Sequence, residues 1–124
     1  MKFYLSGPMR GLPQSNFLAF NKASAMLEKA GYAVYNPTGG KEQPEGDEQL
    51  SDVFSCHLEE LLKCDAIAVL IGWGTSNGAK LEMAVALASG KETYAVFPNR
   101  PPAQMLEKLF NVKIVTRAEA ISVK

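Results

Sequence analysis

Short apolar runs alternate with amphipathic stretches along this chain, and the alternation predicts strands and helices in turn. Residues 2–6 form a β-rich run that stops at Gly7, which is typical of a buried first strand followed by a turn. Residues 16–30 have apolar side chains at helical spacing, and Ser15 or Asn16 is the expected N-cap. The chain therefore begins with a strand, a turn and a helix.

The middle of the chain repeats this order with a longer connection. Residues 32–36 are β-rich, and the polar, glycine-rich stretch 39–48 is expected to be a loop that can cover a site. Residues 65–71 are a continuous apolar run after one aspartate, which is typical of a strand covered on both faces. Between them, residues 50–63 are predicted to form an amphipathic helix. Its apolar face is expected to hold Val53, Phe54, His57, Leu58, Leu61 and Leu62.

The last third predicts a helix over 79–89, a strand over 92–97, a helix over 102–110 and a fifth strand over 112–116. Five strands alternating with helices favour an α/β class. The expected architecture is a flavodoxin-like three-layer sandwich with a five-stranded, mainly parallel sheet, formed by residues 1–124 as a single domain. In such sheets ligands bind beyond the carboxyl ends of the strands, so the turns after strands one and three are the expected site.

The amino-acid composition excludes some classes of function but does not indicate a particular one. The 124 residues are 47% hydrophobic and 21% charged, and 13 basic side chains balance 13 acidic ones. This is the balance of a soluble globular protein, and no global positive field exists to attract a nucleic-acid polymer or a membrane. No export signal or membrane span is expected, and Cys56 and Cys64 are interpreted as reduced, so the expected location is cytoplasmic. The spacings predict no metal site and no cofactor.

The first candidate site is the turn Ser6-Gly7-Pro8-Met9-Arg10-Gly11. Gly7 and Gly11 allow close backbone approach, and Arg10 offers a fork of donors that suits phosphate or carboxylate. Ser6 adds a hydroxyl at the end of the strand. The simpler interpretation is a strand-to-helix turn with a surface arginine, and the spacing matches neither the dinucleotide fingerprint nor a P-loop.

The second candidate is the segment from Gly72 to Glu82. Ser76 and Gly78 lie at a predicted helix start, where backbone N–H groups favour anions. Glu82 is a lone carboxylate early in an otherwise apolar helix, so it either complements the helix dipole or is a reacting group. Trp73 either stacks on a base or lies at the rim of the core.

Two further side chains are candidates for chemistry. Tyr4 shares a strand face with Ser6, so its hydroxyl either reaches the site or is a satisfied group in the core. His57 is the only histidine, and on an amphipathic helix it is either a residue at the edge of the core or a catalyst.

Together, residues 4–11, the pattern Leu58-x-x-Leu61-x-x-Cys64-Asp65 and the segment Gly72-Trp73-x-x-Ser76-x-Gly78-Ala79-x-x-Glu82 resemble the nucleoside 2-deoxyribosyltransferase-like superfamily. The resemblance covers residues 2 to about 97. Within it, the pattern is similar to small phage and prophage proteins of unassigned function and to the 2′-deoxynucleoside 5′-phosphate N-hydrolases.

The resemblance implies a role for each matching residue. Glu82 would attack the anomeric carbon and form a glycosyl-enzyme intermediate, Tyr4 would orient it, and Arg10 and Ser76 would contact a 5′-phosphate. Water, or a second base, would then release the sugar, as in retaining glycosidases. The implied partner is a nucleotide or nucleoside, and the implied assembly is a homodimer.

Two positions depart from the family pattern. Pro8 stands where the hydrolases have a phosphate-contacting serine, and His57 stands where the family has its catalytic aspartate. A histidine there can donate a proton to the leaving base. We therefore expect an enzyme acting on the N-glycosidic bond of a (deoxy)nucleoside 5′-monophosphate, with Glu82, Tyr4 and His57 as its catalytic residues. The alternative is a nucleotide-binding module without turnover, such as a sensor or a phage-encoded modulator.

Overall fold

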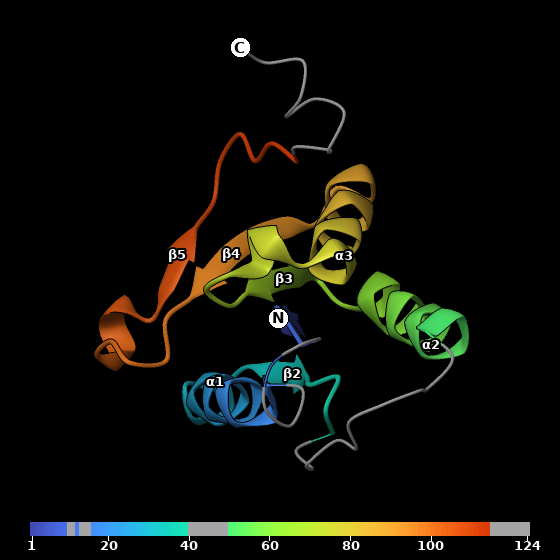
Figure 1. Cartoon of the computed structure of the whole chain (residues 1–124). Helices are drawn as coiled ribbons and strands as arrows, with labels where there is room; N and C mark the ends of the chain where they lie inside the picture. The colour runs from blue at the N-terminus through green and yellow to red at the C-terminus, as the bar shows by residue number, and fades with distance from the viewer. Residues whose placement is uncertain (10–11, 13–15, 40–49, 115–124) are drawn as a thin grey trace.

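The computed structural model describes residues 1–9, 12, 16–39 and 50–114, with the backbone alone over 50–56. Its centre is a five-stranded sheet in the order β2-β1-β3-β4-β5 (Figure 1). The strands are β1 (Lys2–Ser6), β2 (Ala33–Tyr35), β3 (Ala66–Val69), β4 (Glu92–Val96) and β5 (Leu106–Lys108). The helices are α1 (Phe17–Lys29), α2 (Leu50–Lys63) and α3 (Asn77–Ala88), with short 3₁₀ turns η2 (Trp73–Thr75) and η3 (Pro102–Gln104).

The first four strands are parallel, and β5 alone pairs antiparallel, with β4. This order is the flavodoxin-like one, so the predicted fold class is confirmed. The strand order reverses between β1 and β3, which are neighbours in the sheet. Asp65 helps to fix that pairing, because its carboxylate accepts a hydrogen bond from the backbone N–H of Lys2 at 2.7 Å.

Helices cover the two faces of the sheet as separate layers. In Figure 1, α1 lies on one side of the sheet while α2 and α3 lie together on the other. Beneath α1 is a buried cluster of Phe3, Leu5, Phe20, Ala23, Leu27, Ala66, Ala68, Leu70, Val96 and Met105. Beneath α2 and α3 is a second cluster of Tyr4, Leu61, Cys64, Ile67, Val69, Met83 and Ala86. All four residues of β3 are buried, as its unbroken apolar run predicted.

The region after β4 is where the prediction is wrong. Residues 102–110 do not form a helix: a 3₁₀ turn is followed by the edge strand β5. The backbone N–H of Phe97 donates to Met105 at 2.7 Å, and Met105 packs into the cluster beneath α1. Pairing with the exposed edge of β4 therefore overrides local helix propensity. The fifth strand is not at 112–116, because 112–114 have no strand geometry and 115–116 lie outside the described residues.

Smaller differences concern the ends of elements. Strand β3 stops at Val69, and Ile71 is 72% exposed in the turn that follows, whereas the apolar run predicted burial to that residue. Leu62 is 53% exposed and does not belong to the buried face of α2. Asn16 is the N-cap residue of α1, but its side chain makes no capping hydrogen bond and instead donates to the carbonyl of Pro8 at 2.9 Å. The loop expected over 39–48 lies outside the described residues from 40 onward.

Helices that are long and apolar enough to cross a membrane do not occur among the described residues.

Candidate functional site

The turns after β1 and β3 lie against each other, as neighbouring strands require. The backbone N–H of Leu70 donates to the carbonyl of Ser6 at 2.8 Å. A side chain on Gly7 would put its Cβ 2.9 Å from the Cβ of Leu70, so only glycine fits this close approach. Gly72 has a φ of 88°, and a Cβ there would meet Pro8 at 3.4 Å. Gly7 thus serves strand packing, whatever its part in ligand binding.

Helix α3 begins directly after the turn that follows β3, and its Glu82 side chain faces β1. Ser76 is the N-cap residue of α3, and its hydroxyl accepts a hydrogen bond from the backbone N–H of Ala79 at 3.2 Å. That cap satisfies one of the free N–H groups of the first turn. Glu82 follows in the second turn, where its side chain faces the sheet and is only 8% exposed. The lone carboxylate is therefore buried rather than placed in solvent near the helix dipole.

Two hydroxyls from β1 hold the Glu82 carboxylate, one on each oxygen. Ser6 donates to Oε1 at 2.7 Å, and Tyr4 donates to Oε2. Tyr4 and Ser6 point to the same face because they are two residues apart on one strand. Both are almost fully buried. The carboxylate is thus held in one orientation by two side chains of one strand, β1.

Burial decides the protonation behaviour of this group. Burial raises the pKa of Glu82 above its ordinary value, and the hydrogen bonds from Tyr4 and Ser6 offset that rise only in part. Burial also raises the pKa of Tyr4 far above the usual phenol value, and the neighbouring Glu82 charge adds to the rise. Tyr4 therefore remains a hydrogen-bond donor at any working pH.

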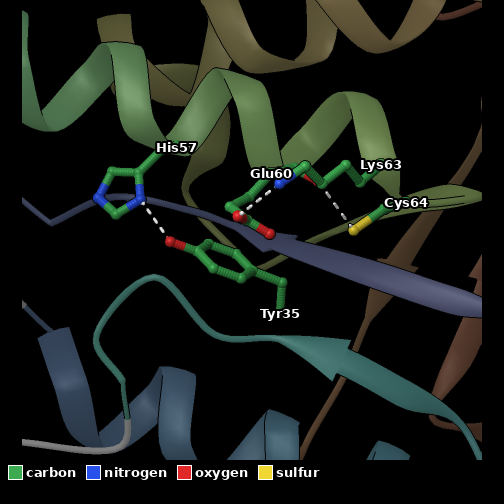
Figure 2. Close-up of polar contacts among 5 residues, drawn as sticks. All are labelled: Tyr35, His57, Glu60, Lys63 and Cys64. Atoms are coloured by element: carbon green, nitrogen blue, oxygen red, sulfur yellow. Dashed lines mark hydrogen bonds and ion pairs between the residues drawn. The ribbon is translucent and has the colours of Figure 1, made fainter.

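His57 lies on α2 and contacts Tyr35, which the sequence analysis did not single out as a candidate. Figure 2 shows the Tyr35 hydroxyl, at the end of β2, pointing to the His57 ring, and the hydroxyl oxygen is 3.0 Å from Nδ1. Tyr35 and Tyr4 are register partners, and their rings stack with centroids 5.3 Å apart. Tyr35 belongs to the β-rich run 32–36, and it shares a face of the sheet with Tyr4 once the two strands pair in parallel.

Other contacts on α2 are structural. Lys63 and Glu60, drawn in Figure 2, form an ion pair. Their N–O distance is 3.3 Å, and a surface pair of this kind contributes little to stability. The Sγ of Cys64 donates to the Glu60 carbonyl at 3.3 Å. Cys64 is a buried free cysteine, and burial raises the pKa of its thiol, which disfavours the nucleophilic thiolate.

Of the remaining predicted binding residues, the structure describes Trp73 and Gly78 but not Arg10 and Gly11. Trp73, in η2, is half-buried and packs against the cluster beneath α2 and α3, so it lies at the core rim. Gly78 is in the first turn of α3, two residues after the cap. Arg10 and Gly11 lie outside the described residues, and their proposed contact with phosphate remains a prediction. Among the described residues, no three His, Cys, Asp or Glu side chains are grouped in a way that would hold a metal ion.

The fold defines the broad class of protein. A 2-deoxyribosyltransferase from the psychrotolerant bacterium Bacillus psychrosaccharolyticus, described as a biocatalyst for nucleoside synthesis, has a similar structure with a TM-score of 0.61. The match has 22% sequence identity and covers 82% of this chain and 75% of the other. It therefore shows a shared flavodoxin-like α/β fold. The chain itself belongs to the family described as Domain of unknown function (DUF4406), whose model matches residues 1–94. No curated protein matches the sequence.

Proposed function

We propose that this protein is an enzyme of nucleoside glycosyl transfer, with Glu82 as the nucleophile. The observation that supports this most directly is the buried carboxylate held by the hydroxyls of Tyr4 and Ser6. A carboxylate at this depth costs stability, since burial disfavours its charge. Buried ionisable groups with shifted pKa values are concentrated at the active sites of enzymes. The shared fold with a 2-deoxyribosyltransferase supports a nucleoside-type substrate.

The finer proposal is cleavage of the N-glycosidic bond of a (deoxy)nucleoside 5′-monophosphate. One oxygen of ionised Glu82 bonds to C1′ of the sugar as the bond from C1′ to the base nitrogen breaks. The electron pair goes to the base, which takes a proton from His57. Water then attacks C1′, gives its proton back to His57, and releases Glu82; a second base in place of water gives transfer instead. Tyr4 and Ser6 orient the carboxylate through both steps.

The phosphate part of the proposal rests on the sequence. Arg10 follows β1 in the sequence, and a guanidinium can donate two hydrogen bonds to a phosphate. Ser76 is at the start of α3, where helix N–H groups favour anions. We expect Arg10→Ala to weaken binding of a nucleoside monophosphate far more than binding of the matching nucleoside. Isothermal titration with both ligands measures this difference. Equal losses for the two ligands would remove phosphate recognition from the proposal.

A second candidate is nucleotide binding without turnover. Two features favour it: burial raises the pKa of Glu82 and so disfavours the charged nucleophile, and His57 stands where the resembled deoxyribosyltransferase-like superfamily has an aspartate. Incubation with a panel of nucleosides and nucleoside monophosphates, with free base measured by chromatography, separates the two candidates. Release of base that Glu82→Gln abolishes supports the enzyme.

The variant His57→Asp, tested in the same base-release assay, separates the two candidates further. If His57→Asp cleaves nucleotides and the wild type does not, the natural protein is a binder descended from an enzyme. If neither cleaves any member of the panel while a nucleotide still binds, the binding function stands and the glycosidase is rejected. If His57 is the proton donor, His57→Ala slows the wild-type reaction by roughly a hundredfold, the usual scale for a positioned acid.

A further inference from the structure

Two tyrosines on neighbouring strands connect the two candidate catalytic groups. Tyr4 and Tyr35 are opposite each other in the parallel pairing of β1 and β2. Their rings are nearly parallel, with an angle of 15° and centroids 5.3 Å apart. One hydroxyl donates to Glu82 on α3, and the other contacts His57 on α2. The pair thus ties residues of two helices to one place on the sheet.

The contact with Nδ1 bears on which nitrogen of His57 can do chemistry. An imidazole that first gives a proton to a base and later takes one from water must use the same nitrogen in both steps. When Nδ1 is bonded to a neighbouring oxygen, Nε2 is the nitrogen that changes its proton. The Tyr35 oxygen, 3.0 Å from Nδ1, is in position to accept a hydrogen bond from Nδ1–H.

We propose that Tyr35 is a positioning residue: its oxygen accepts a hydrogen bond from Nδ1–H of His57 and so reserves Nε2 for proton transfer with the leaving base and with water. The inference rests on the proposed function for the role of Nε2. The bond to Nδ1 and its direction can be tested without any activity. Stacking on Tyr4 fixes the Tyr35 ring, so the acceptor does not depend on a flexible side chain.

Nitrogen NMR of the full-length protein tests the hydrogen bond. His57 is the only histidine, so ring signals are assigned without ambiguity. At a pH where the ring is neutral, we expect Nδ1 to hold the proton and Nε2 to be bare, the opposite of the preference of free histidine. Tyr35→Phe keeps the stacked ring, removes the hydroxyl, and should return the proton to Nε2. A bare Nδ1 in the wild type, or an unchanged spectrum in Tyr35→Phe, would overturn the proposal.

Tyr32→Phe is the matched control. It removes a phenol hydroxyl from the residue three positions earlier, whose ring packs against Phe3 in the cluster on the other face of the sheet. The His57 spectrum should not change in this variant. A change as large as that in Tyr35→Phe would show a general effect of altering this part of the chain, and would overturn the specific role of Tyr35.

Single-turnover release of base tests the functional half. A nucleotide with an unmodified purine needs a proton on its leaving base, whereas a 7-methylated purine is already cationic and leaves without one. Tyr35→Phe should slow release of the unmodified base about tenfold, the lower end of what losing a histidine-orienting partner costs at metal sites. Release of the methylated base should be unchanged. In a His57→Ala background, Tyr35→Phe should add nothing.

The outcomes separate this inference from the function on which it rests. If Tyr35→Phe slows both substrates equally, the residue is only structural and the positioning role is overturned, while loss of activity in Glu82→Gln still supports the nucleophile. If the wild type releases neither base, the proposed function fails and the role of Nε2 fails with it. The NMR result then decides the Tyr35 hydrogen bond by itself.

Discussion

The two faces of the central sheet are built from the same strand in opposite ways. Alternate residues of β1 send Phe3 and Leu5 beneath α1, and Tyr4 and Ser6 toward α3. The first face carries a buried apolar cluster, where large side chains stabilise the fold by leaving water. The second face encloses a carboxylate between two hydroxyls. Both faces therefore contribute apolar burial to stability, but only the second also buries a carboxylate, at a cost in stability.

Hydrogen bonding limits the cost of burying the Glu82 carboxylate. Among the described residues, no buried side-chain nitrogen or oxygen lacks a hydrogen-bond partner. Glu82 therefore pays mainly for the loss of hydration, which its two hydrogen bonds offset in part. We therefore expect a core change on the α1 face to act on stability alone, and a change to Glu82 to act mainly on turnover. Substitutions at Glu82, Leu27 and Ser76 test this division.

The largest effect is expected on turnover from Glu82→Gln. The amide keeps the shape of the side chain but has no nucleophilic charge, so base release should fall by roughly a thousandfold or more, while ligand affinity stays within a few-fold. Single-turnover assays and isothermal titration measure the two quantities. Retained turnover would mean that another group attacks C1′, and the division between the faces would lose its main support.

On the α1 face, Leu27→Ala should lower the free energy of unfolding by about 2–5 kcal/mol, because Leu27 is fully buried and the change leaves a cavity. Turnover per folded molecule should stay near that of the wild type. Urea denaturation and an activity assay at low temperature give both numbers. The control is Leu18→Ala on the same helix, where the side chain is 69% exposed and little stability should be lost. A specific loss of turnover in Leu27→Ala would show that the faces are coupled.

Ser76→Ala should cost about 1 kcal/mol of stability, since it removes the N-cap hydroxyl of the helix that bears Glu82. Ser76→Asp restores a capping oxygen and should recover most of that loss. If Ser76 also contacts the 5′-phosphate, the aspartate repels it and KM for a monophosphate rises, with little change for the nucleoside. Equal KM changes for both substrates would restrict Ser76 to its structural role.

The smallest expected effect is a gain in the stability of Glu82→Gln over the wild type, and this gain depends on pH. The folded state raises the pKa of Glu82 above its ordinary 4.5, so it binds the proton more tightly than the unfolded chain does. The contribution of this group to stability therefore falls as pH rises through the interval above 4.5. Glu82→Gln has no such titration, and should be more stable than wild type near neutral pH and converge with it toward pH 4. Thermal melts across this range test the sign.

Exposed Glu59 on α2 provides the control, because Glu59→Gln removes a carboxylate that is already hydrated. Its melting temperature should follow the wild type across the same range of pH. A wild type that gains stability relative to Glu82→Gln on going from pH 4 to neutrality would contradict the direction of the Glu82 shift.

Local patterns in the sequence predicted most elements of the fold and singled out the two candidate turns. The helix over 50–63 was predicted with its observed bounds, and the apolar run after Asp65 indicated the central strand, because period and burial are local signals. Glu82 stood out as the lone carboxylate of an apolar helix. The sequence left open whether it was an ordinary helix-end charge or a buried group.

Tertiary structure decided what depends on pairing between distant residues. Residues 106–108 fall within the helix predicted over 102–110, yet they form a strand because they pair with the edge of β4. Tyr35 became part of the site only through its register with Tyr4, 31 positions earlier in the chain. The burial of Glu82 likewise required β1 to bring Tyr4 and Ser6 to within hydrogen-bonding distance, since no local pattern shows which distant hydroxyls will meet a carboxylate.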